Sequence, residues 1–257
     1  MLAAGLGGCQ TMSDITGSVT ANSATGKSEP APDADPQRVI EYYGERFRAN
    51  PKDVDAALAY GQALRTNGQR AQAVAVLEQA CITNPGNKAL LAGWGRALAD
   101  NGNFQQAFDV LSRAHTPENP DWRILSVQGT ALDQLGRHDE ARRYYASALK
   151  IVPGEPSVLS NLGMSYMLSK ELPKAEEALR QAMANPKAGS KVRQNLGLVV
   201  GLQGRFAEAE QIVKGDLPPD EAAANVAYLR EMLKGNKDNS RPSGRGASRV
   251  PVAELGR

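Results

Sequence analysis

Residues 54–87 read VDAALAYGQALRTNGQRAQAVAVLEQACITNPGN, which predicts two short amphipathic helices joined by a tight turn. Asn67-Gly68 predicts the end of the first helix, because glycine readily adopts the left-handed backbone conformation that terminates helices. A second helix then runs to the stop at Asn84-Pro85-Gly86. One such pair cannot bury both of its apolar faces, so the stretch predicts neighbours of the same kind. The face of the first helix has the i, i+3, i+4, i+7 spacing of small and apolar residues: Ala57, Tyr60, Gly61 and Leu64.

The sequence contains such neighbouring helix pairs: the same residue types return at a constant step of 34 residues. A small residue in each helix lets the two helices of a pair cross closely, and we expect the large residue that follows to fill the gap to the next repeat. The glycines are Gly61, Gly95, Gly129, Gly163 and Gly197. The alanines are Ala73, Ala107, Ala141, Ala175 and Ala209, and the large residues are Leu77, Leu111, Tyr145, Leu179 and Val213. The turn glycine recurs as Gly68, Gly102, Gly136 and Gly204, with Lys170 in its place in one repeat.

This pattern resembles the tetratricopeptide repeat, and Trp94-Gly95 with Leu98 and Leu162-Gly163 with Tyr166 are good local copies of its signature. The resemblance implies an all-α superhelical solenoid of helix-turn-helix repeats over residues 36–235. The predicted parts are a half repeat at 36–53, full repeats at 54–87, 88–121, 122–155, 156–189 and 190–220, and a capping helix at 220–235 in which Ala224, Tyr228 and Leu229 cover the last repeat.

The two ends of the chain have different compositions from the repeats. Leu6-Gly7-Gly8-Cys9 resembles a bacterial lipobox, in which the cysteine is lipidated, and Gln10 after it implies the outer membrane by family analogy. Residues 1–9 read as the remnant of a signal with its lipobox, but the apolar run of residues 1–8 is too short for a secretory signal and has no Lys or Arg before it. Either the true start lies upstream, which we favour, or Cys9 is an ordinary residue. Residues 10–35 read as a flexible tether, and residues 236–257 as a disordered basic tail.

Composition argues against several classes of function. A formal net charge of +2 is too small to indicate nucleic acid as a partner, and two cysteines cannot make a disulfide framework. His115 and His138 have no second ligand at metal-binding spacing, and no serine or cysteine stands in a catalytic motif. We therefore expect no catalysis, no cofactor, no metal and no small-molecule substrate.

A protein partner is expected instead, because the first helix of each repeat in this family lines a concave groove. The late part of that groove combines amides with apolar side chains, a mixture that suits an adaptable binding surface. We expect Asn161 and Asn195 to hold the backbone of a partner segment; the alternatives are that these amides satisfy neighbouring groups and that the terminal helix covers part of the patch. The predicted groove residues are Asn161, Met164, Met167, Leu168, Lys191, Asn195, Leu198 and Leu202.

Repeats, a lipobox-like start, a polar tether and a basic tail together resemble the TadD-like lipoproteins of tight-adherence (Flp) pilus assembly. That resemblance implies a non-enzymatic outer-membrane protein that faces the periplasm, is anchored through a lipid, and assists the assembly or localisation of a secretin. One alternative is another envelope adaptor, such as a type IV pilotin or an adaptor for peptidoglycan hydrolases. Another is a cytoplasmic scaffold or co-chaperone, if no signal peptide exists.

Overall fold

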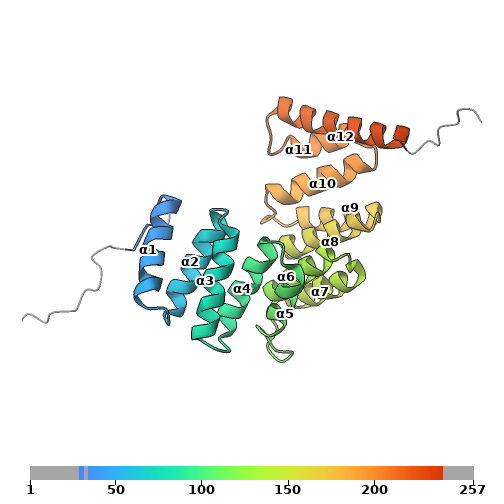
Figure 1. Cartoon of the computed structure of the whole chain (residues 1–257). Helices are drawn as coiled ribbons and strands as arrows, with labels where there is room; N and C mark the ends of the chain where they lie inside the picture. The colour runs from blue at the N-terminus through green and yellow to red at the C-terminus, as the bar shows by residue number, and fades with distance from the viewer. Residues whose placement is uncertain (1–28, 32–33, 240–257) are drawn as a thin grey trace, which may run out of the picture.

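The computed structural model describes residues 29–31 and 34–239, and in this part of the chain it is an open helical solenoid (Figure 1). The all-α repeat architecture predicted from the sequence is confirmed, and the described residues contain no strand beyond one isolated bridge between Thr116 and Asn119. The helices are α1 (Pro36–Ala49), α2 (Val54–Thr66), α3 (Arg70–Thr83), α4 (Lys88–Asp100), α5 (Phe104–Ser112), α6 (Trp122–Gln134), α7 (His138–Ile151), α8 (Pro156–Leu168), α9 (Leu172–Met183), α10 (Ser190–Leu202), α11 (Phe206–Val213) and α12 (Pro219–Asn239).

Short polar side chains cap three of the first helices, α2, α4 and α6, at their starts. Asp53 Oδ1 accepts a hydrogen bond from the backbone N–H of Ala56, and Asn87 does the same for Leu90. Asp121 accepts one from the N–H of Arg123. These bonds satisfy backbone donors that have no partner within the first turn of a helix.

Each pair of helices crosses where the sequence repeats its glycine. A Cβ atom on Gly95 would lie 2.5 Å from the side chain of Leu111, and the same clash would arise at the four equivalent glycines. The five repeat alanines are fully buried. The large residue after each alanine therefore packs on the glycine of its own pair. Leu77 also reaches the next repeat, since a Cβ on Gly93 would lie 3.5 Å from it.

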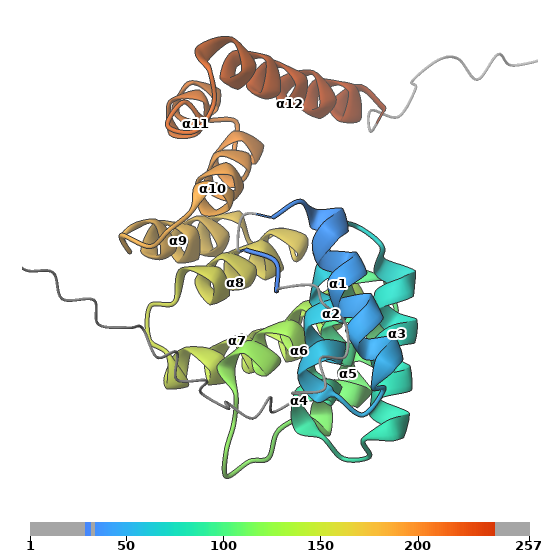
Figure 2. The same cartoon turned by 90° about the vertical axis from the view of Figure 1, so that its left-hand side faces the viewer.

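The solenoid has an inner and an outer side because its two sets of helices pack differently. The first helices α2, α4, α6, α8 and α10 each contact the next first helix along the chain. Successive second helices, α3 to α11, make no comparable contact within the described residues. Figures 1 and 2 show the stack turning so that α10 to α12 stand apart from α1 to α3. The first helices thus form the inner face.

The terminal helix differs from the sequence prediction in length and orientation. It runs through Gly235 to Asn239, because a single glycine weakens a helix by only about 1 kcal/mol and Asn236 to Asn239 can continue it. Ala222 and Val226 are the residues it buries, and Leu229 packs against Gly201 of α10. The predicted contacts of Ala224 and Tyr228 were wrong, since both face solvent.

In the described part of the chain, none of the helices is both long enough and apolar enough to cross a bilayer. Cys9, most of the predicted tether and the tail from residue 240 lie outside the described residues.

Candidate functional site on the inner face

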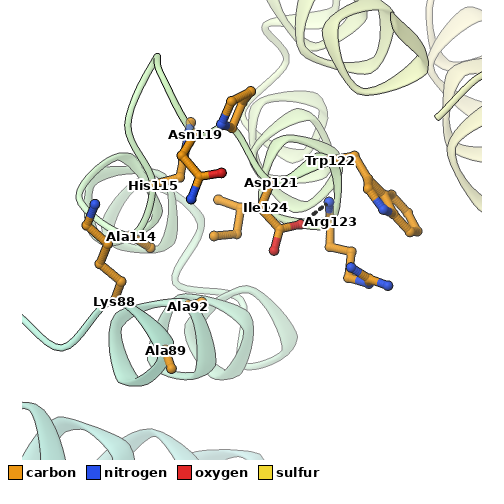
Figure 3. A pocket seen from close by; sticks show the side chains of 11 residues that line it. Lys88, Ala89, Ala92, Ala114, His115, Asn119, Asp121, Trp122, Arg123 and Ile124 are labelled. Carbon is orange, nitrogen blue, oxygen red and sulfur yellow. Dashed lines mark hydrogen bonds between the residues drawn. The ribbon is translucent and has the colours of Figure 1, made fainter. Parts of the chain in front are cut away.

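In the described part of the chain, two pockets lie between successive first helices, at positions two repeats apart. One pocket of about 390 Å³ lies between α4 and α6, and one of about 350 Å³ lies between α8 and α10. Both are built from the N-terminal halves of two successive first helices and from the loop that precedes the later of the two. The early pocket is lined by Lys88, Ala89, Ala92, Ala114, His115, Asn119, Pro120, Asp121, Trp122, Arg123 and Ile124 (Figure 3). The late pocket is lined by Glu155, Pro156, Ser157, Ser160, Asn161, Lys187, Gly189, Lys191 and Val192.

Charged side chains surround the early pocket. Lys88 and Arg123 lie on opposite sides of it, with Asp121 between them (Figure 3). The guanidinium carbon of Arg123 lies 4.7 Å from the centre of the Trp122 ring, a distance at which the aromatic face attracts a cation. His115 Nε2 donates to Gln128 Oε1 at 3.1 Å, whereas its buried Nδ1 has no partner among the described residues. The pocket is therefore polar and contains more positive than negative groups.

Asn161 and Asn195 occupy equivalent places but use their amides inside the protein. Asn161 Nδ2 donates to Ser126 Oγ at 3.1 Å, and Asn195 Nδ2 donates to Ser160 Oγ at 3.0 Å. Each bond joins a first helix to the preceding first helix, and both hydroxyl-bearing serines are buried. These contacts correspond to the alternative in which the amides satisfy neighbouring groups. No donor in the described residues reaches either amide oxygen, so each oxygen remains able to accept a bond from a partner.

The other predicted groove residues do not gather into one surface. Lys191 is exposed beside Asn161 in the late pocket, and Met164 is partly buried. Met167 packs against a core cluster formed with α9, α10 and α12, whereas Leu168 is 45% exposed. The last two residues are divided between two further pockets beside α12: Leu198 in one and Leu202 in the other.

The pocket that contains Leu198 is the feature that the sequence prediction missed. It measures about 440 Å³ and lies between α10, the end of α11 and α12. Leu217 and Val226 line it, and Tyr228 and Met232, one helical turn apart on α12, are 70% and 56% exposed. The spacing of Tyr228 and Met232 was the available signal, but the sequence alone did not show which face of α12 packs.

A buried polar network lies between the two inner pockets. Asp133 on α6, 7% exposed, accepts hydrogen bonds from Ser165 Oγ at 2.7 Å, His138 Nδ1 at 2.9 Å and Tyr145 Oη at 2.9 Å. Burial, and then the nearby Asp133 charge, raises the pKa of Tyr145, so the phenol stays protonated and donates. Asp133 thus ties the repeat at 122–155 to the next one through Ser165. Groups of three or more potential metal ligands are absent from the described residues.

Comparisons with known sequence families identify repeats along most of the solenoid. Residues 40–114 match the family described as anaphase-promoting complex, cyclosome, subunit 3. Residues 93–156 and 134–196 each match a family described as tetratricopeptide repeat. No match was found among curated protein sequences.

Solved structures of repeat proteins resemble the whole solenoid. The APC/C heterotetramer Cut9–Hcn1 has a TM-score of 0.64 at 17% identity over 79% of this chain, which spans about two fifths (40%) of that chain. A tetratricopeptide repeat protein from Parabacteroides merdae has a TM-score of 0.64 at 14% identity, covering 77% of each chain. The protein pilF of Pseudomonas aeruginosa has a TM-score of 0.56 at 15% identity, covering 73% of this chain and 97% of its own. At these identities the likeness establishes the fold.

Proposed function

Because the chain is a tetratricopeptide-repeat protein, we propose that it is a non-enzymatic scaffold of the cell envelope that helps to assemble or place the secretin of a tight-adherence pilus. Interaction with other proteins is the function that these repeats indicate, and the fold is generally non-enzymatic. The observation that carries the proposal is the inner face, where two equivalent pockets lie between first helices and present polar side chains to a partner.

The envelope part of the proposal is supported by the order of segments in the sequence. A lipobox-like Leu6-Gly7-Gly8-Cys9 is followed by a polar stretch of about two dozen residues and then directly by the repeats. A single acyl chain holds a protein to a bilayer only marginally, and stable anchoring needs more than one. Lipidation of Cys9 would keep the repeats tethered beside the membrane while the inner face remains free to bind.

The experiment compares the wild-type protein with Cys9→Ser, both expressed from the native gene. Wild type is expected to partition into detergent and to co-purify the secretin, and Cys9→Ser is expected to move into the soluble periplasmic fraction. A Thr11→Ser change in the same segment is the matched control and should behave as wild type. If wild type and Cys9→Ser were both recovered from the cytoplasm, and neither brought the secretin with it, the proposal would be contradicted.

A further inference from the structure

Acidic and basic side chains are distributed unequally between the two sides of the solenoid. The first helices α2, α4, α6, α8 and α10 contain no glutamate. Glutamates of the repeats stand on second helices or in loops: Glu78, Glu118, Glu140, Glu155, Glu171, Glu176, Glu177, Glu208 and Glu210. The first helices carry three aspartates: Asp133 is enclosed in its network, Asp100 pairs with Arg65 at 2.7 Å, and Asp55 is exposed in the first turn of α2. Six basic residues on the same helices outnumber them: Arg65, Lys88, Arg96, Arg123, Lys191 and Arg193. Positive charge therefore dominates the inner face.

The positive charge is concentrated where the first three repeats meet. Arg65 on α2, Arg96 on α4 and Arg123 on α6 come from three first helices that pack in succession. Arg96 is half-buried; burial lowers its pKa, the charges of Arg65 and Arg123 lower it further, and Asp121 opposes them. Within the described residues, no carboxylate oxygen comes within 4 Å of a guanidinium nitrogen of Arg96 or Arg123. Arg96 and Arg123, whose charges influence each other, thus lack an ion-paired carboxylate among the described residues.

The geometry beside these arginines suits a carboxylate side chain on an extended polypeptide. Arg123 borders the pocket between α4 and α6, and its guanidinium is held over the Trp122 ring. Lys88 stands across the pocket, and alanines form part of the lining between them (Figure 3). A guanidinium binds a carboxylate through two parallel N–H donors, and this geometry is specific as well as strong.

We propose that the inner face of residues 54–155 binds an acidic segment of a partner polypeptide, with Arg96 and Arg123 pairing with its carboxylates. This inference rests on the proposed scaffold function and names the chemistry of the partner. Asp121 lies close enough to Arg96 to act on its pKa, and Asp100 pairs with Arg65, so acidic groups interrupt the positive charge of this face. Such a surface suits a segment with separated carboxylates better than the continuous phosphates of a nucleic acid.

The test measures binding of a short fluorescein-labelled peptide rich in glutamate to the full-length protein by fluorescence anisotropy. The reference is the same peptide with every glutamate replaced by glutamine. We expect the glutamate peptide to bind more tightly, to weaken with added salt, and to lose about 10-fold in affinity in Arg96→Gln and in Arg123→Gln. Arg143→Gln removes the same charge from an exposed position on α7 and should leave binding unchanged.

Circular dichroism melting of each variant checks that the solenoid is intact. Equal binding of the two peptides, an equal loss in Arg143→Gln, or tighter binding of a single-stranded oligonucleotide than of the glutamate peptide would each overturn the inference. These outcomes are separate from the test of the scaffold function, since co-purification of the secretin by wild-type protein does not depend on either peptide.

Discussion

At the scale of the residue, Lys170 has a backbone conformation that its side chain disfavours. Its φ is 64°, whereas glycines with similar φ occupy the equivalent turns, Gly136 at 76° among them. A residue with a Cβ is strained in this region by about 1–2 kcal/mol. Replacing it with glycine removes the strain, but part of that gain is lost because glycine gives up more backbone entropy on folding. We predict that Lys170→Gly raises the free energy of unfolding by about 0.5–1 kcal/mol in urea titrations, and that Gly136→Lys lowers it. An unchanged midpoint in both variants would show that these turns are not strained.

Residue spacing predicted the tightly packed positions but not the polar ones. Gly129 was identifiable because it repeats at a fixed step, and any side chain there would collide with Tyr145. The Asp133 network was not identifiable, because Tyr145 occupies a position that other repeats fill with leucine or valine. Asp133 is on α6, and its partners come from two other helices, α7 and α8. A polar group without a periodic counterpart leaves no signal in a repeat alignment.

At the scale of the element, the bonds from Asn161 and Asn195 join neighbouring first helices. Asn161→Ala leaves the buried Ser126 hydroxyl without its donor, and Asn195→Ala does the same to Ser160. We expect each change to lower the free energy of unfolding by about 1 kcal/mol, measured by thermal or urea denaturation. Gln194→Ala, at an exposed position on α10, is the control and should change stability little. Unchanged stability together with weaker capture of a partner would instead make both asparagines binding residues.

Helix boundaries in the repeats followed from local sequence, because glycine turns and polar caps act within a few residues. The face of α12 that packs against the solenoid did not follow from local sequence, because the orientation of α12 depends on the surface that α10 and α11 leave open. Leu229 is placed by Gly201, a contact between elements that have no repeat counterpart to compare. For the same reason the predicted late groove was divided: Leu198 and Leu202 border α12 in two different pockets.

At the scale of the whole molecule, an ionic network connects the outer helices of the last two repeats. Glu176 on α9 accepts bonds from Gln203 at 2.8 Å and Arg205 at 2.7 Å, and Arg180 bridges to Glu208 at 2.6 Å. Burial raises the pKa of Glu176, but the bonds from Gln203, Arg205 and Arg180 outweigh it, so the pKa lies below its ordinary value of 4.5. The stabilisation from the Glu176 charge is therefore complete above the ordinary pKa of the carboxyl group, and it is lost as pH falls through the lowered pKa of Glu176 in the folded protein.

We predict that Glu176→Gln lowers the free energy of unfolding at neutral pH by about 0.5–1 kcal/mol, since Arg205 is partly exposed to solvent. The difference between variant and wild type should shrink below the ordinary carboxyl pKa, as followed by urea unfolding at a series of pH values. Glu177→Gln, the neighbouring carboxylate without an ion pair among the described residues, is the control. A variant with the same deficit at every pH would contradict the role of the Glu176 charge.

The continuous contact between first helices also has a mechanical consequence. Successive first helices contact one another directly, whereas successive second helices of the described residues are joined to each other through side-chain bridges such as Arg205 to Glu176. We therefore expect the solenoid to bend by separating its second helices, while the stack of first helices keeps its length. Flexing changes the distances between outer helices first and alters the spacing of the two inner pockets least. A load applied between the ends of the stack would be carried along the same surface that we propose to bind the partner.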